Sequence, residues 1–180
     1  MKGQKKAEWI EKGYTIAASE GIKNIRIESI ARELDKNKSS FYHYFGDLES
    51  FENELLAHHI AEIKELAIQL ARCKSMRPDV LNLFILQKTD LFFHKQLRIN
   101  RSVPRYKACF EQAFQILEDA VIQQWSTFLG LKQRQLFART FFQLIADNFL
   151  LQITEDNFNY EWISQYLDEI HSILQRMNSN

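Results

Sequence analysis

The sequence predicts an all-α protein, with an N-terminal three-helix helix-turn-helix module followed by a larger helical domain. Only five Gly and two Pro occur in 180 residues, about 4% of the chain against about 12% in an average protein. Val (three) and Thr (five) are also scarce, which argues against a sandwich or barrel of many short strands. Apolar residues make up 46% of the chain, enough to form a buried core.

Charge divides the chain into two parts. Residues 1–46 hold nine Lys and Arg against six Asp and Glu, and residues 47–180 hold fourteen against seventeen. The whole chain is neutral, with 23 of each sign, so any binding to nucleic acid must come from a local patch. We therefore predict a small basic module over 1–46 and a regulatory domain over 47–180. No Gly/Ser-rich linker separates them, so a continuous helix is expected to join them.

The composition also indicates a compartment. Cys73 and Cys109 lie far apart within helical patterns, which is typical of a reduced cytoplasmic protein and not of a disulfide framework. The basic start of the chain is not followed by an apolar stretch, so no signal peptide is expected. Apolar runs are only a few residues long, and no membrane segment is expected.

Three short helices are predicted in the N-terminal module. Apolar residues at helical spacing predict the first over residues 5–19, with Gly21 in the C′ position that ends a helix. The second is expected over 27–34. A polar break at 35–37 separates it from the third, over 38–45.

The remaining helices are longer. An N-cap at Asp47 predicts a fourth helix to about residue 72. Pro78 fits the first turn of a helix that continues to Leu97. A further helix is expected over 105–129, and amphipathic stripes predict two more before the C-terminus.

Two short helices joined by a tight polar turn are the outline of a helix-turn-helix, whose second element enters the major groove of DNA. Its first turn must present compact polar groups to base edges, and flanking groups must bind phosphate. The predicted base contacts are Asn37, Lys38, Ser39 and Ser40, and the predicted phosphate contacts are Arg26, Lys36, Tyr42 and His43. The alternative is that these residues only solvate a turn or complete an aromatic core.

The stretch from Ile10 to Phe51 resembles the DNA-binding domain of the TetR (tetracycline-repressor type) family of transcriptional regulators. The resemblance is carried by Ile30-Ala31, Tyr42-His43-Tyr44-Phe45 and Glu49, with Ile16 and Gly21 in the first helix and at its end. It covers about a quarter of the chain. It implies a DNA-binding regulator, in most cases a repressor, which is released from or retained on a palindromic operator by a small-molecule ligand.

Several positions depart from the family pattern. Arg26 replaces a small or capping residue, Asp35-Lys36-Asn37 replaces a Gly-Val-Ser turn, and Leu48 replaces a lysine that grips phosphate. Gly13 and Ala17 stand where the first helix of the family carries alanine and phenylalanine. One phosphate contact is therefore expected to be missing unless Arg26 or Lys36 replaces it. Leu48 argues for an alternative function, a helical interaction module of the same fold that has lost DNA binding.

The resemblance also implies a ligand pocket and a homodimer. Tyr106, Phe110 and Trp125 are the predicted pocket lining, although aromatic residues at helical spacing are equally typical of a filled core. Dimerisation through the last two helices would form a four-helix bundle, unless their stripes cover only their own subunit. The predicted interface residues are Phe141, Leu144, Ile145, Trp162, Tyr166, Ile170 and Ile173.

No pattern in the sequence favours an enzyme. His58 and His59 are adjacent, so they cannot both reach one metal ion from one helix, and no metal or cofactor is expected. A small-molecule carrier remains as an alternative, without residues that argue for it. The run Leu91–Phe110 holds no acidic residue. It is a surface strip, the entrance for an anionic ligand, or the contact for an acidic partner.

Overall fold

The computed structural model describes residues 2–178 of the chain, and the side chains of residues 5–176. Within residues 2–178 all regular structure is helical and there is no β-strand, so the all-α prediction is confirmed. No helix in this part of the chain is long and apolar enough to cross a bilayer.

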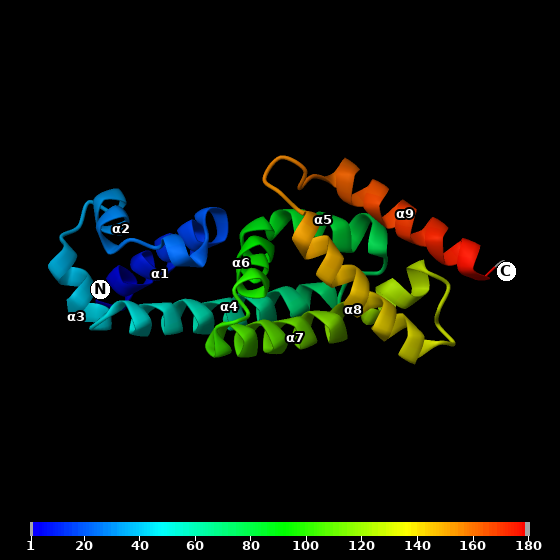
Figure 1. The fold of residues 1–180 in the computed structure, drawn as a ribbon, viewed down its shortest axis with the longest axis horizontal. Coiled ribbons are helices and arrows are strands. Elements are labelled where there is room, and N and C mark those ends of the chain that lie inside the picture. Colours follow the sequence, from blue (N-terminus) through cyan, green and yellow to red (C-terminus); the bar gives the residue numbers. More distant parts are fainter. Residues whose placement is uncertain (1, 179–180) are drawn as a thin grey trace. The chain divides into compact units, whose positions relative to one another are not determined.

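The chain forms two compact units. The first consists of the residues up to Ile63 together with Thr89–Ala113, and the second of Lys64–Lys88 together with the residues from Phe114 on. The long helices α4 (Leu48–Leu70) and α7 (Pro104–Phe128) contribute residues to both units (Figure 1). The two units are defined by packing alone. The division into a DNA-binding module over 1–46 and a regulatory domain over 47–180 stays a prediction.

The first unit begins with the helices expected from the sequence. They are α1 (Lys2–Glu20), the 3-10 turn η1 (Ile22–Asn24), α2 (Ile27–Glu33) and α3 (Lys38–Phe45). Gly21 ends α1 in a backbone conformation with φ of 105°, which glycine adopts readily, and its N–H bonds to the carbonyl of Ala17 at 3.1 Å. The predicted C′ glycine is confirmed.

Four aromatic rings hold α3 against α1 and α4. Phe41 and Phe45, on the inner side of α3, pack against Phe51 of α4 with ring centroids 5.1 and 4.8 Å apart. Trp9 of α1 lies edge-on to Phe41 at 5.4 Å. All four side chains are buried, so this aromatic cluster sets the face that α3 turns outward.

Gly13 makes room for this cluster. A methyl group at Gly13 would lie 2.4 Å from Cζ of Phe51, well inside van der Waals contact. The ring of Phe51 is fully buried and is held by Phe41 and Phe45, so it has little space to move. The glycine in the first helix is therefore explained by close packing.

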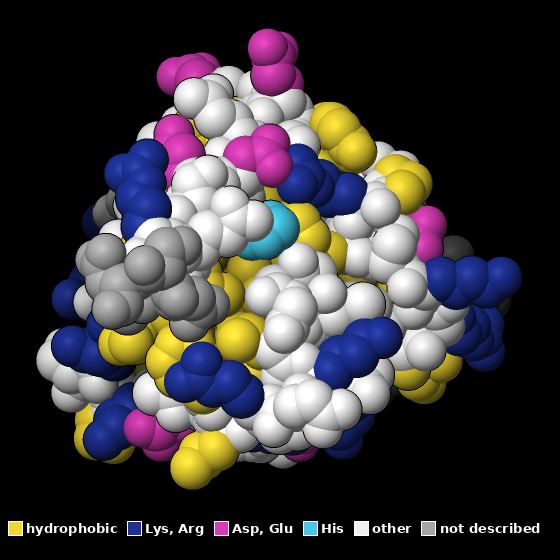
Figure 2. Space-filling view, turned by 90° about the vertical axis from the view of Figure 1, so that its right-hand side faces the viewer, with side chains coloured by type: hydrophobic (Ala, Val, Ile, Leu, Met, Phe, Trp, Pro, Cys, Tyr) yellow, Lys and Arg dark blue, Asp and Glu magenta, His cyan; other side chains and the backbone are white. Residues whose placement is uncertain are grey.

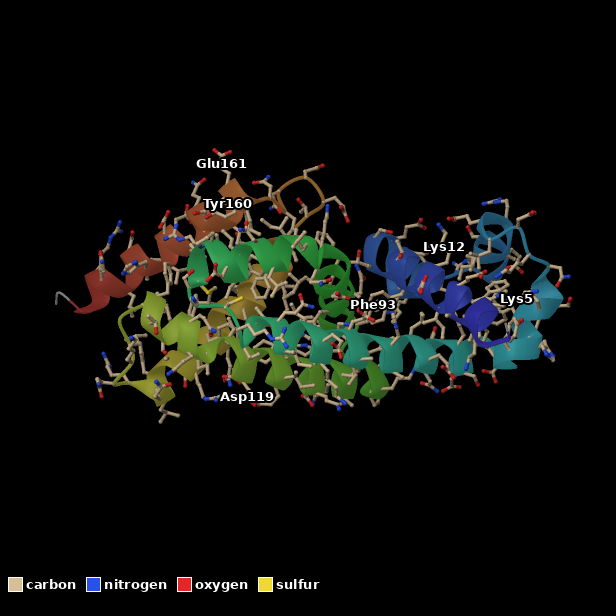
Figure 3. All side chains as sticks on the ribbon, turned by 180° about the vertical axis from the view of Figure 1, so that it is seen from behind. Lys5, Lys12, Phe93, Asp119, Tyr160 and Glu161 are labelled. Carbon is tan, nitrogen blue, oxygen red and sulfur yellow. The ribbon has the colours of Figure 1, made fainter. Side chains whose placement is uncertain are left out.

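A chain of buried polar side chains joins α1, α4 and α6 (Lys88–Ile99). The Tyr14 hydroxyl donates to Oδ1 of Asp90 at 2.8 Å, so its oxygen accepts from Nδ1 of His59 at 2.7 Å. Nε2 of His59 then accepts from Nδ1 of His94, 3.3 Å away. Burial lowers the pKa of both imidazoles, so both are neutral, and in this donor order each carries its proton on Nδ1. Phe93, labelled in Figure 3, lies beside this chain. Its ring stacks on Tyr14 with centroids 4.3 Å apart.

The second unit contains the π-helical segment η2 (Met76–Val80), α5 (Leu81–Leu86), α8 (Gln135–Gln152) and α9 (Tyr160–Asn178). The prediction of one helix from Pro78 to Leu97 is wrong, because it breaks at Gln87 (φ −97°, ψ 35°) into α5 and α6. Leu81 is buried in the second unit and Leu97 in the first. The break lies next to the boundary between the two units, at Lys88 and Thr89.

Tyr166 anchors α9 to α8. Its hydroxyl lies 3.1 Å from the carbonyl oxygen of Ile145 and 3.0 Å from Oδ1 of Asn148, and its ring stacks on Trp162 at 5.5 Å. Trp125 of α7 is buried and donates its Nε1–H to the carbonyl of Ala138 at 3.1 Å. These bonds satisfy polar groups that the core would otherwise leave unpaired.

We expect Gly13→Ala to lower the free energy of unfolding by about 1 kcal/mol, measured by urea denaturation. Overpacking against Phe51 costs about 1–3 kcal/mol, which is partly offset by the higher helix propensity of alanine, about 1 kcal/mol. In a Phe51→Leu background the same substitution should be neutral or stabilising, because the ring is gone. If Gly13→Ala raised the free energy of unfolding in the otherwise wild-type protein, close packing of Phe51 against Gly13 would be contradicted.

The free energy of unfolding should decrease as the pH falls from 7.5 to 5.5. Burial lowers the pKa of His59, and that of His94 to about 3, whereas an unfolded histidine titrates near pH 6.5. The unfolded state therefore takes up more protons below pH 6.5, and each imidazole accounts for a loss of about 1 kcal/mol. Burial raises the pKa of Asp90, which acts in the opposite direction near the carboxylate range.

Urea denaturation at the two pH values measures this effect. His94→Gln should reduce the pH-dependent loss by about half, since one titrating group is removed. A wild-type stability that does not change between pH 7.5 and 5.5 would contradict the neutral buried pair.

Candidate nucleic-acid interface

The N-terminus of α3 is organised by Asn37. As the N-cap residue, it accepts the backbone N–H of Ser40 on Oδ1 at 2.9 Å, and the Ser39 hydroxyl donates to the same oxygen at 2.7 Å. The Ser40 hydroxyl donates to the Asn37 carbonyl oxygen at 2.8 Å. Three predicted base contacts thus lie in one local cluster, with the serine oxygens still able to accept hydrogen bonds.

Both predicted lysines carry an acidic partner. Lys38 donates to Glu28 in the first turn of α2, and Lys36 donates to Glu8 on α1. The hydrogen bond between Lys38 and Glu28 raises the pKa of the ammonium group and lowers the pKa of the carboxyl group. Binding of either lysine to DNA would replace a contact that already exists.

The two predicted phosphate contacts on α3 face outward. Tyr42 is 45% exposed, and its ring lies edge-on to the buried Phe41 at 5.5 Å. His43 is exposed as well. The helix therefore separates an inner aromatic side from an outer polar side, as the sequence pattern predicts.

Arg26 forms its hydrogen bonds with the backbone that precedes α2. It occupies the N-cap position of α2 without a side-chain cap, and its Nη1 donates to the carbonyls of Lys23 and Ile25, each at 3.2 Å. Leu48 begins α4 and is 36% exposed, so an apolar side chain stands where the family carries its phosphate-binding lysine.

The turn between α2 and α3 borders a hollow of about 260 Å³. Lys5 and Tyr44, which the sequence prediction missed, line it together with Asp35, Lys36, Asn37 and Ser40. Lys5 lies at the start of α1 (Figure 3). The basic start of the chain is the sequence feature that could have indicated it as part of the interface. Asp35 has φ of 51°, a left-handed conformation that Asp tolerates better than most residues. This explains how it stands in place of the family glycine.

Comparison with known proteins gives a match to a solved structure. The chain is similar to the crystal structure of a candidate TetR-family transcriptional regulator from Mesorhizobium loti, with a TM-score of 0.62 and 15% sequence identity over 98% of each chain. The chain has the TetR-type fold. The resemblance seen at Ile10–Phe51 is thus confirmed for the fold and extends along the chain. No protein-family profile and no curated protein matches the sequence.

Within this TetR-type fold, the three predicted ligand contacts have separate packing roles. Tyr106 is buried and donates to Oε2 of Glu52 at 2.8 Å, while Phe110 stacks on His94 with centroids 4.5 Å apart. Both lie in the first unit, whereas Trp125 belongs to the second. Their role in ligand binding stays a prediction.

The predicted dimer residues differ in exposure. Leu144 and Ile173 are 65% and 50% exposed, whereas Tyr166 and Ile170 are already buried in the single chain. The other three, Phe141, Ile145 and Trp162, are partly exposed. Two leucines of α8 outside the predicted set, Leu136 and Leu151, are also exposed.

The acid-free run Leu91–Phe110 is not a continuous basic surface. His94 is buried, and Arg105 pairs with Glu49 at 2.6 Å and with Glu52. Lys107 lies 3.7 Å from Glu111. The face at which α9 ends also mixes Lys and Arg with acidic and apolar side chains (Figure 2). Among the described residues no cluster of three or more His, Cys, Asp or Glu side chains is placed to hold a metal ion.

Proposed function

We propose that the protein is a homodimeric, DNA-binding transcriptional regulator of the TetR family. The observation that carries this proposal is the outer side of α3, where a polar first turn capped by Asn37 and the exposed Tyr42 and His43 lie opposite a buried aromatic side. A helix with such a polar turn, fixed on a three-helix scaffold, can enter a major groove.

The proposed roles follow from the chemistry of each side chain. Ser39, Ser40 and Asn37 offer hydrogen-bonding groups to base edges. The Tyr42 hydroxyl and the His43 imidazole donate to phosphate oxygens on either side, which sets the register of the helix. Lys36 and Lys38 add phosphate or base contacts once they leave their carboxylate partners, and Arg26 is the most peripheral contact.

Regulation is proposed to follow from two linked equilibria. A small-molecule ligand that binds one dimer geometry more tightly changes the distance between the two α3 helices and with it the affinity for DNA. Because the two equilibria are linked, DNA changes the affinity for the ligand by the same factor. We propose that the protein is cytoplasmic and represses transcription from a two-fold related operator, without enzymatic activity.

A second candidate is supported by Leu48. An interaction module with the same fold would not need a cation at the head of α4, and an exposed leucine there suits an apolar partner. Selection of duplexes from a random-sequence pool at two salt concentrations separates the candidates. Recovery of a two-fold related motif supports the regulator, and a folded dimer that selects no duplex supports the interaction module.

Tyr42→Phe should weaken binding to the selected operator about tenfold, because one charge-assisted hydrogen bond to phosphate is lost while the ring packing is retained. Fluorescence anisotropy measures the dissociation constant. Tyr160→Phe is the matched control, since Tyr160 is similarly exposed but lies on α9. Equal effects of the two substitutions would exclude a contact of Tyr42 with DNA.

Leu144→Glu should convert the dimer to a monomer at micromolar concentration, because a charge would be buried in the proposed four-helix interface. Analytical ultracentrifugation measures the mass. Leu86→Glu is the control, because Leu86 is 77% exposed on α5. A wild-type protein that sediments as a monomer would contradict the dimer, and with it the paired recognition helices.

A further inference from the structure

The basic residues of the recognition turn are neutralised within the first unit. The carboxylate that pairs with Lys38 comes from α2, and the one that pairs with Lys36 comes from α1. The side chains of Lys38 and Glu28 are 47% and 65% exposed, and those of Lys36 and Glu8 are 20% and 43% exposed. Both pairs are thus accessible to a competing anion from solvent.

We propose that Glu28 and Glu8 are built-in competitors of DNA. Their carboxylates occupy Lys38 and Lys36 in the DNA-free protein, and a DNA phosphate or base edge has to displace them before either lysine binds. This inference rests on the proposed function, and it assigns these two acids a role in tuning affinity and suppressing binding to non-operator DNA.

The strength of such pairs suits this role. Exposed ion pairs contribute little to stability and are screened by salt, so a phosphate in the right position exchanges with the carboxylate easily. A phosphate that reaches only one lysine gains little, because it must first break the existing pair. The net charge of +3 over residues 1–46 therefore overstates the cationic sites open to non-specific DNA.

Glu28 also has a local reason to stay beside Lys38. It lies in the first turn of α2, where a negative charge is favoured by the unpaired N–H groups of the helix terminus. A purely structural acid at this position would leave DNA affinity unchanged beyond the effect of its charge. A charge-matched control separates the two roles.

The experiment compares Glu28→Gln and Glu8→Gln with Glu33→Gln. Glu33 lies on α2 and pairs with Lys12 of α1 at 2.5 Å, so its substitution makes the same charge change in the same module at a lysine outside the predicted interface. Anisotropy with a random-sequence duplex of about 30 base pairs gives the dissociation constants at about 50 and about 200 mM salt.

Glu28→Gln and Glu8→Gln should each tighten binding about threefold to tenfold at the lower salt, against less than about twofold for Glu33→Gln. The gain should shrink at the higher salt, because screening weakens the ion pairs. In a Lys38→Gln background, Glu28→Gln should increase the affinity for DNA by no more than Glu33→Gln does.

Three results would overturn the inference. If the wild type binds the duplex and all three variants bind it with the dissociation constant of the wild type, Glu28 and Glu8 do not compete with DNA, and the proposed function stands. If the gain from Glu28→Gln persists without Lys38, the acid acts by general repulsion and not through its pair. If the wild type and all three variants leave the duplex unbound at the lower salt, the proposed function fails together with the inference.

Discussion

The packing of Phe51 against Gly13, Phe41 and Phe45 is the constraint on which the orientation of α3 depends. The ring fills the space that a side chain at residue 13 would occupy, and it supports the inner side of α3. With two of its aromatic residues held inside, α3 can only turn Tyr42 and His43 outward. The proposed DNA contacts are thus a consequence of how the core is filled.

Charged groups at the surface of the first unit form ion pairs, and several polar groups in its interior form hydrogen bonds with one another. At the surface, carboxylates neutralise Lys36 and Lys38 in exchangeable pairs. In the interior, Tyr14, His59 and Asp90 form a hydrogen-bonded chain, and burial keeps the imidazoles of His59 and His94 neutral. Under the proposed function the surface pairs exchange with DNA because water screens them, whereas the buried chain responds mainly to pH because burial penalises charge.

The buried chain also ties the N-terminal helix α1 to other helices of the first unit. Tyr14 belongs to α1, His59 to α4 and Asp90 to α6. These three helices are therefore joined by specific hydrogen bonds as well as by apolar contact. A change in the position of α6 would be transmitted to α1 through these bonds, which would give the proposed ligand control a physical route inside one compact unit.

The sequence by itself determined the helical class, the three short helices with the glycine that ends the first, and the outline of α3, because these follow from local periodicity and capping. Only the tertiary structure decided the break at Gln87, the burial of His94 and Arg105's pairing with Glu49, because each depends on residues distant in the chain. The role of Gly13 was hidden for the same reason, since a glycine's neighbours leave no trace in local sequence.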